Sequence, residues 1–183
     1  MEECLAARRS VREYRSAGLS LAEVGQLLWA GQGITADGNL RTAPSAGALY
    51  PLEVYLAAGR VDGLDPGLYK YRPERHDLAR VASGDQRKDL ATAALDQDCV
   101  RLAPVTIAFA AVYRRITVKY GPRGVRYVHL EAGHATQSVL VQAVALGLGG
   151  VPVGAFDDTG VRRILRLATE EEPLYLLPIG RLR

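Results

Sequence analysis

The alternation of hydrophobic and polar positions predicts a chain of mixed helices and strands. Between residues 19 and 30, apolar side chains recur at three- and four-residue spacing, which is typical of one helix face. Ser20, with Glu23 three residues later, forms a capping-box pattern that starts this helix. The pattern further predicts a loop at residues 35–48, strands at residues 52–58, 68–71, 105–112 and 174–180, and helices at residues 85–94, 126–146 and 158–167.

This order of elements indicates an α+β fold rather than strict βαβ alternation. We expect a mostly antiparallel sheet packed between helices. Residues 138–146 are apolar or small nearly all round the predicted helix, so this segment should lie in the core or in an interface. Gly147 and Gly149 should end the helix. No repeat, linker or convincing boundary divides the chain, which we interpret as one domain covering residues 1–183.

Composition excludes several classes of protein. The net charge is only +3, and no long basic run accompanies it, so a strong nucleic-acid binder is not expected. The longest apolar stretches fall short of the roughly 20 residues that cross a bilayer, so no membrane association is expected. Cys4 and Cys99 have no second cysteine at metal or redox spacing, and a reducing cytoplasm is the default location.

Four separated stretches carry the candidate chemistry. Each could be an ordinary terminus, loop or helix end when taken alone. In Arg8-Arg9-Ser10-Val11-Arg12, guanidinium groups and a hydroxyl could hold a phosphate, although a solvated basic terminus is the simpler alternative. The others are Pro-Ser-Ala-Gly-Ala-Leu-Tyr-Pro at residues 44–51, Gly-Gly-Val-Pro-Val-Gly at residues 149–154 with Gly180-Arg181 behind it, and Lys119-Tyr120-Gly121 followed by Glu131-Ala132-Gly133-His134.

In this order and at these separations, the stretches resemble the flavin-dependent nitroreductase family, and the fourth narrows the resemblance to the SagB/ThcOx-type dehydrogenases. The resemblance implies a nitroreductase-like fold and a domain-swapped homodimer with flavin mononucleotide (FMN) at the subunit interface. It implies catalytic roles for Lys119 and Tyr120. The implied cofactor-binding residues are Arg8, Arg9, Ser10, Arg12, Pro44, Ser45, Ala46, Gly47, Pro152, Val153, Gly154 and Arg181.

The resemblance also implies what the residues on the phosphate and ring side do. Arg8 and Ser10 would hold the phosphate region, Arg181 would add a phosphate contact, and Arg12 would point to the pyrimidine edge of the flavin. Pro152 and Val153 would lie against one face of the ring. The backbone N–H of Gly154 would face flavin N5, the atom that gives and takes the hydride. Arg183 is a weaker second candidate for the phosphate.

The loop at residues 44–51 would line the flavin of the opposite subunit, with Ser45 and Ala46 nearest to it. Two positions depart from the pattern of the family. Ala48 stands where many nitroreductases have Asn, and Tyr50 stands where Gln or His is expected. The side-chain contacts of this loop are therefore open.

In azoline-oxidising members of the branch, a Lys-Tyr pair serves as the catalytic base. Converting an azoline to an azole removes a ring proton and a hydride, so a base must take the proton. Lys119 could act as that base if nearby cations, such as Arg114 and Arg115, lower its pKa. The substrate would be a small molecule or a modified peptide.

Two other functions stay open. One is NADH- or NADPH-dependent reduction of a nitroaromatic or a quinone, which needs a nicotinamide donor but no base at Lys119. The other is a flavin-binding scaffold without turnover, since the chain begins directly at the first motif. Glu131 and His134 stand three residues apart on one helix, but a di-iron site would need a second such pair, so no metal is expected.

Overall fold

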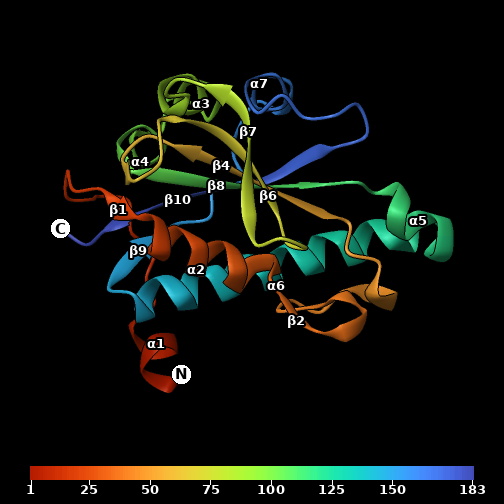
Figure 1. The fold of residues 1–183 in the computed structure, drawn as a ribbon. Coiled ribbons are helices and arrows are strands. Elements are labelled where there is room, and N and C mark those ends of the chain that lie inside the picture. The colour runs from red at the N-terminus through yellow and green to blue at the C-terminus, as the bar shows by residue number, and fades with distance from the viewer.

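The computed structural model describes residues 1–183 and is built on a six-stranded sheet with the order β7-β6-β4-β8-β10-β9 (Figure 1). Neighbouring strands in this sheet are all antiparallel, which confirms the expected α+β class. The strands are β4 Leu52–Ala58, β6 Gly67–Arg72, β7 Asp77–Ser83, β8 Val105–Ala111, β9 Leu148–Gly150 and β10 Glu172–Arg181. Two small pairs complete the sheets: β1 Leu19–Ser20 with β5 Val61–Asp62, and β2 Ile34–Ala36 with β3 Leu40–Arg41.

Helices cover both faces of the sheet (Figure 1). The long helix α6 Arg123–Ala145 and helix α2 Leu21–Gln32 lie on one face. On the other face lie α3 Arg87–Ala93, α4 Asp98–Leu102 and α7 Asp158–Ile164. Two further helices, α1 Glu2–Ala7 and α5 Arg114–Tyr120, lie near opposite ends of α6. No helix combines the length and the apolar character that crossing a membrane requires.

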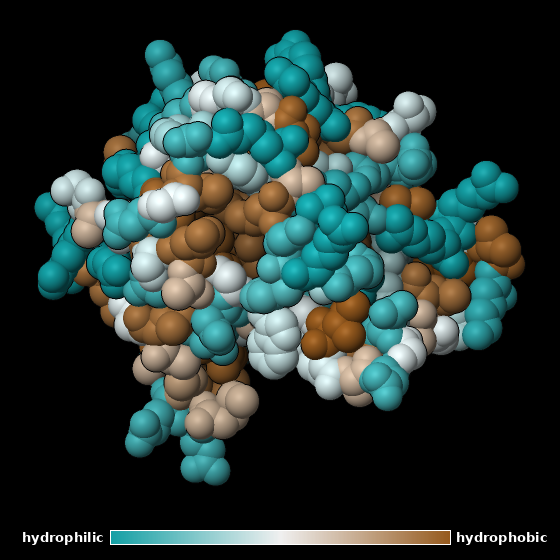
Figure 2. Space-filling view, in the orientation of Figure 1, coloured by the Kyte–Doolittle hydropathy of each residue, from teal (hydrophilic) through white to brown (hydrophobic).

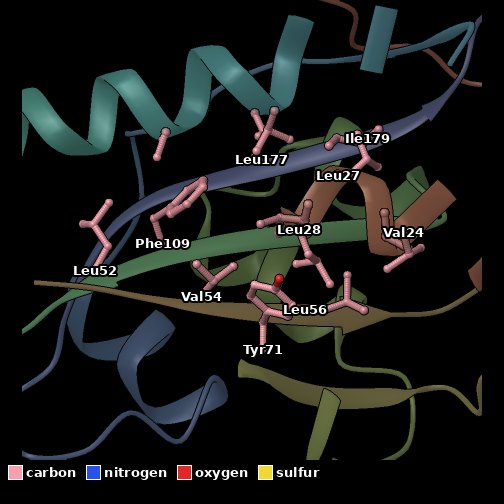
Figure 3. Packing of buried hydrophobic residues seen from close by; sticks show 14 of the residues in the cluster. Val24, Leu27, Leu28, Leu52, Val54, Leu56, Tyr71, Phe109, Leu177 and Ile179 are labelled. Carbon is pink, nitrogen blue, oxygen red and sulfur yellow. The ribbon is translucent and has the colours of Figure 1, made fainter. Parts of the chain in front are cut away.

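The sheet separates two hydrophobic cores. The larger cluster has 26 buried residues, among them Phe109, Leu177 and Leu28, and lies under α2 and α6 (Figure 3). The smaller cluster has 16 buried residues and lies under α3, α4 and α7. Along β8, Phe109 belongs to the first cluster and Ala108 to the second, since side chains of a strand alternate between faces. This central strand is therefore apolar throughout.

Helix α2 begins as its capping box predicts. The Ser20 hydroxyl accepts a hydrogen bond from Glu23 N (3.2 Å), and a Glu23 carboxylate oxygen accepts one from Ser20 N (2.7 Å). The helix extends to Gln32, two residues past the predicted end, and it includes Gly31, which is buried. A Cβ at Gly31 would lie 3.0 Å from Val139 and 3.3 Å from Phe109, so the glycine lets α2 approach the core closely.

The sequence pattern does not predict α1, α4, α5 and β7, and it misplaces two glycines. Gly149 and Gly150 belong to β9 and pair with β10, whereas we expected a helix end and a turn there. Helix α6 ends at Ala145, just before Gly147, which has a φ of +69°, so the helix end expected at this glycine is confirmed. Residues 73–76 form the turn between β6 and β7, and the expected loop at residues 35–48 contains part of β2 and all of β3.

The strand register places two groups of predicted residues at opposite ends of the sheet. At one end, Ala111 of β8 is opposite Leu52 and Glu172; at the other end, Val105 is opposite Ala58 and Ile179. Six residues of strand separate the two ends, a distance of about 20 Å. The loop that enters β4 and the helix that follows β8 therefore lie far from the end of β10.

Candidate functional site

Two of the four stretches singled out in the sequence come together at one end of the sheet. Ser10 forms a parallel bridge with Gly150, and Val11 N donates to Gly150 O at 3.0 Å. Across β9, Gly150 pairs with Ile179 in β10, and Arg181 stands opposite Leu148. Strand β9 is thus flanked by the N-terminal segment on one side and by the Gly180–Arg181 strand end on the other.

The N-terminal segment presents alternate side chains to opposite sides. Val11 packs toward the sheet, where a Cβ at Gly149 would lie only 2.7 Å from a Val11 methyl carbon. Arg8, Ser10 and Arg12 alternate with Val11, and no hydrogen bond or ion pair within the chain engages their side chains. The Arg9 guanidinium bends back to the carbonyls of residues 6 and 8. Of the predicted phosphate and pyrimidine ligands in this segment, Arg8, Ser10 and Arg12 are free to bind an anion.

Arg181 is already partly engaged. Its Nε donates to Gly18 O at 3.2 Å, and one terminal nitrogen, Nη2, pairs with the Glu23 carboxylate at 3.0 Å. Burial raises the pKa of Glu23, but hydrogen bonds from Ser20 and Arg181 outweigh it and hold the pKa below its usual value. The other terminal nitrogen of Arg181, Nη1, has no partner in the chain. A phosphate would therefore share this guanidinium with Glu23.

The predicted ring-side residues follow β9. Val153 is buried and exchanges two backbone hydrogen bonds with Leu176, at 2.7 and 2.9 Å. Gly154 is exposed, and its N–H donates to no acceptor within the chain. A Cβ at Gly154 would meet only the Tyr175 ring, at 3.4 Å, so no other group of the chain covers the backbone on this side. A free N–H on a fixed strand edge suits an external acceptor such as a flavin nitrogen.

A hollow of about 460 Å³ adjoins Arg12, Tyr14 and residues 97–99. Gln97 ties this region to the ring-side segment, because its amide donates to Ala155 O at 3.0 Å. The sequence pattern does not identify Gln97, Asp98 and Cys99 as candidate site residues, since it does not predict α4. The polar run at residues 96–98 before the apolar β8 was the one available signal, and it resembles many loops.

The fourth stretch meets the loop at residues 44–51 at the other end of the sheet. Gly47 has a φ of +63°, and a Cβ there would lie 2.7 Å from the Tyr120 hydroxyl and 2.9 Å from Lys119 Nζ. Both side chains thus cover the glycine closely. Lys119 is exposed, its amine is 5.4 Å from the centre of the Tyr120 ring, and no carboxylate pairs with it. The two residues lie at the end of α5, where we expected a loop.

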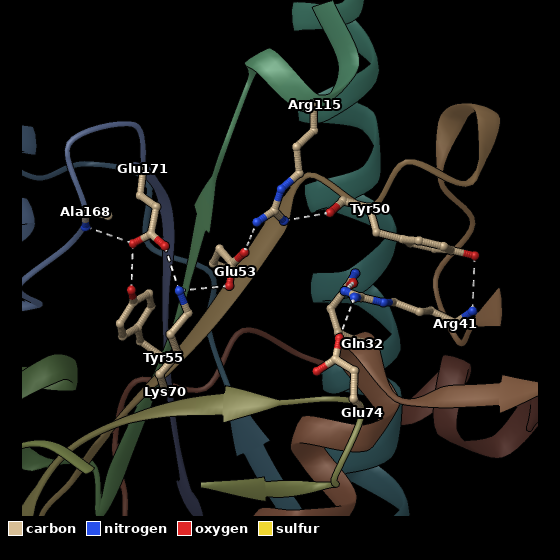
Figure 4. Close-up of polar contacts among 10 residues, drawn as sticks. All are labelled: Gln32, Arg41, Tyr50, Glu53, Tyr55, Lys70, Glu74, Arg115, Ala168 and Glu171. Carbon is tan, nitrogen blue, oxygen red and sulfur yellow. Dashed lines mark hydrogen bonds and ion pairs between the residues drawn. The ribbon is translucent and has the colours of Figure 1, made fainter. Parts of the chain in front are cut away.

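Arg115 does not act as expected. It donates to Tyr50 O at 3.0 Å and forms an ion pair with Glu53, so a carboxylate balances the charge that was expected to act on Lys119 (Figure 4). Glu53 also pairs with Lys70 at 3.0 Å, and Lys70 in turn pairs with the buried Glu171 at 2.7 Å. Arg115 therefore anchors the loop to a chain of charges that crosses β4 and β6.

The backbone N–H and the hydroxyl of Tyr50 are both hydrogen-bonded within the chain. Its N–H donates to the Ser45 hydroxyl at 2.9 Å, and its hydroxyl accepts from Arg41 N at 3.2 Å. The Arg41 guanidinium lies 4.7 Å from the centre of the ring (Figure 4). With a φ of +45°, Tyr50 holds a backbone conformation that is costly for a bulky residue, and these contacts hold it there. Tyr50 fixes the shape of the loop.

Glu131 lies beneath this loop on α6 and is only 2% exposed. Neither carboxylate oxygen has a hydrogen-bond partner in good geometry. Burial raises the pKa of Glu131 to about 7, and the nearby Ser45 hydroxyl and Arg41 charge oppose this rise only in part. His134 on the same helix is exposed. No group of three or more His, Cys, Asp or Glu side chains in the chain could hold a metal ion.

One chain does not bring all the predicted residues together. Arg8, Ser10, Arg12 and Arg181 lie on the side of β9 and the C-terminus, Gly154 follows the Val153–Leu176 bridge near the middle of the sheet, and the loop and α5 lie at the far end (Figure 1). The first group fits FMN, because unpaired cations and a hydroxyl can hold a phosphate and a free N–H can meet the ring. The second group offers an amine and a phenol that lie close over Gly47.

Comparison with known proteins identifies relatives across nearly the whole chain. The family model described as "Nitroreductase family" matches residues 5–181. A nitroreductase-like protein of Methanocaldococcus jannaschii is 48% identical over 181 residues, which cover 99% of this chain and 90% of that protein.

Solved structures share the fold. A nitroreductase-like protein of Anabaena variabilis superposes with a TM-score of 0.88 and 30% identity over 100% of this chain, which spans only 38% of the Anabaena chain. The E. coli microcin synthetase complex gives a TM-score of 0.82 and 22% identity, covering 98% of this chain and 72% of that one. At that identity the likeness shows the fold alone.

Proposed function

Because the chain belongs to the nitroreductase family, a family of oxidoreductases, we propose that it is an FMN-dependent enzyme that works as a homodimer. Arg8, Ser10 and Arg181 would hold the phosphate, and Arg12 would face the pyrimidine edge. The Gly154 N–H would meet N5. Bound FMN would supply two-electron chemistry by taking a hydride at N5. The support is that Arg8, Ser10, Arg12 and the Gly154 N–H are all unpaired within the chain.

The distance between the two residue groups supports the homodimer. The loop at residues 44–51 lies about 20 Å from Arg181 along the sheet, so one chain places the proposed phosphate ligand and the proposed ring-lining loop near opposite ends of its strands. In a two-fold dimer, the loop of one copy could cover the flavin held by the other, and each dimer would then have two equal sites. Half-exposed Val141 and Val144 on α6 offer apolar surface for such a contact.

The favoured reaction is oxidation of an azoline ring in a small molecule or a modified peptide. The observation that carries it is the close approach of Lys119 Nζ and the Tyr120 hydroxyl to Gly47. The substrate ring would lie beside this glycine. The Lys119 amine would take the ring proton while the hydride leaves to the flavin, and the Tyr120 hydroxyl would help position the ring. Oxygen would then reoxidise the flavin.

A second function is NADH- or NADPH-dependent reduction of a nitroaromatic or a quinone. The relative that is 48% identical, described as nitroreductase-like, favours it. This reaction needs a nicotinamide donor and no base at Lys119. The E. coli microcin synthetase, with a truncated pro-MccB17 bound, is similar in fold only and does not decide between the two.

Three measurements test the proposal. The purified protein should be yellow and should release FMN on denaturation; a colourless protein that cannot be reconstituted would contradict FMN use. Anaerobic mixing with NADH or NADPH should leave the flavin oxidised, and an azoline peptide should bleach it. Bleaching by a nicotinamide donor and none by azolines would establish the second function instead.

A further inference from the structure

A second hollow lies away from every residue assigned to the flavin. It has a volume of about 700 Å³ and lies between α2 and the hairpin of β6 and β7. Figure 2 shows it as an apolar recess over these elements. Its walls are mainly apolar, with Leu21, Ala22, Gly25, Leu28, Leu64 and Leu78. Pockets that bind small molecules have about 300–1,000 Å³ and such a lining.

Gly25 keeps part of this space open. It lies in the interior of α2, where glycine costs about 0.5–1 kcal/mol relative to alanine. A Cβ at Gly25 would meet only the His76 ring, at 3.7 Å from Nε2, which is an ordinary contact. The packing of the chain itself therefore does not require glycine here. The absence of a side chain at Gly25 leaves space beside His76.

His76 places one polar atom at the hollow. Its Nδ1 is 2.8 Å from the Tyr71 hydroxyl, and the two rings meet edge to face at 89°. Tyr71 is buried and its hydroxyl has no other hydrogen-bond partner in the chain, so we assign the phenol as the donor to Nδ1. The ring proton of a neutral His76 is then on Nε2, the nitrogen that faces Gly25.

The backbone of His76 supports this placement. Its φ is +48°, in the left-handed region, and its N–H donates to Pro73 O at 3.2 Å. This conformation belongs to the tight turn at residues 73–76 between β6 and β7, which holds the histidine at the hollow. The neighbouring Asp77 is bound by Arg72 through two hydrogen bonds of 2.6 Å, so its charge is balanced. No unpaired carboxylate at the hollow repels an acceptor.

We propose that this hollow binds a small molecule with an apolar body and one hydrogen-bond acceptor, a carbonyl or carboxylate oxygen, which accepts from His76 Nε2. The leucines would contact the body of the ligand, and the histidine would orient its head. The site is independent of the flavin and of the reaction proposed above.

The test uses the flavin-loaded protein and three fluorinated probes of one shape: 4-(trifluoromethyl)benzoate, the matching benzamide and the matching benzylamine. Binding is followed by fluorine NMR. We expect saturable binding of the benzoate and the benzamide in the millimolar range, and binding of the benzylamine at least about fivefold weaker, since an ammonium cannot accept from Nε2.

Variants locate the binding. Gly25→Leu fills the space beside His76 and should weaken binding of the benzoate at least about tenfold, and Ala22→Trp provides a second filled variant if the first does not fold. His76→Asn tolerates the left-handed backbone and should weaken binding about three- to tenfold. Leu95→Asn changes an exposed leucine outside the hollow and should bind as the unchanged protein does.

Two results would overturn the proposal. One is the absence of saturable binding of any probe up to about 10 mM, a concentration that detects even weak complexes. The other is unchanged binding in both filled variants, which would place the probe elsewhere, for example over the flavin.

Discussion

The Arg181 guanidinium shares the Glu23 carboxylate with the first turn of α2. Arg181 Nη2 lies 3.0 Å from Glu23 Oε2, and the same oxygen accepts from Ser20 N at 2.7 Å. Arg181, the proposed phosphate ligand at the end of β10, is therefore held by the cap of a helix. Glu23 orients this cation and would compete with a phosphate for it.

Neutralising Glu23 should strengthen FMN binding. In Glu23→Gln the amide oxygen can still accept from Ser20, but the negative charge beside Arg181 is gone. We expect FMN affinity to rise about two- to fivefold at low salt and the gain to shrink at high salt, as for a partly exposed ion pair. Quenching of FMN fluorescence measures it. Weaker binding would show that Glu23 acts by orienting Arg181.

Removing Arg181 should weaken FMN binding. Arg181→Ala deletes a charged donor to the phosphate and should cost about 1.5–3 kcal/mol of binding free energy. The control is Arg163→Ala, which removes an exposed arginine from α7. Titration of the flavin-free proteins with FMN gives both values, and equal affinities would place the phosphate elsewhere.

Mixing two impaired variants, at an FMN concentration too low to saturate Arg181→Ala, tests the shared site. Arg181→Ala damages the half that holds flavin, and Lys119→Met damages the half that supplies the base. Mixed dimers would contain one site with both changes and one site with neither. After unfolding and refolding together, about a quarter of the wild-type azoline oxidation should return, since half of the dimers are mixed. If both halves belonged to one subunit, mixing would restore nothing.

Lys119→Met alone should keep FMN and the dimer. The variant retains most of the stem and loses the amine, so azoline oxidation should fall about 10²–10⁴-fold. Reduction of the flavin by a nicotinamide donor, where it occurs, should be nearly unchanged. The activity assay and the anaerobic spectrum separate the two effects, and normal azoline oxidation would exclude the base role.

Glu131 should make the stability of the folded protein depend on pH. Its pKa is about 7 in the fold against 4.5 in the unfolded chain, so folding favours the protonated form. Its effect is absent below pH 4.5, grows as pH rises, and above pH 7 lowers the free energy of unfolding by up to about 3 kcal/mol. Glu131→Gln should remove this slope and raise the melting temperature above pH 7. Urea titrations from acid to alkaline pH check it, with exposed Glu170→Gln as the control. A difference that did not vary with pH would argue against this pKa.

Lys70 should contribute more to the free energy of unfolding than an exposed paired cation does. It lies between Glu53 and the buried Glu171, which also accepts from Tyr55 OH at 2.6 Å. Lys70→Met leaves the buried Glu171 without its cation and Glu53 with Arg115 alone, and it should cost about 2–3 kcal/mol of unfolding free energy. Arg80→Met breaks the exposed ion pair with Asp65 and should cost less than about 1 kcal/mol. Equal losses in urea would contradict the ranking.

Local patterns predicted the elements that have strong periodicity. Strand β4 has the predicted bounds because an apolar run follows a proline-rich loop, and α2 begins at its predicted cap. Helix α5 was missed because its β-branched residues Ile116, Thr117 and Val118 favour strands. Strand β7 was missed because it is an edge strand with little buried surface. Propensity says little where tertiary contacts decide the structure.

The candidate site could be predicted as a set of residues but not as an arrangement. The sequence shows Arg8 and Arg181, but not that Glu23 binds the latter. The sequence contains Tyr50, but it does not show that the Arg41 guanidinium lies over the Tyr50 ring. These contacts join residues far apart in the chain or depend on a left-handed backbone, which periodicity does not report. Gln97 escaped notice for the same reason.

The length of β8 has a thermodynamic consequence. Its two ends lie beside different halves of the proposed site, so in the proposed homodimer each site would need two chains, and flavin occupancy would be linked to association by mass action. Dilution should then release cofactor and separate subunits together, and added FMN should draw separated chains into pairs. The concentration of active dimer would then rise more steeply than the total concentration of the protein.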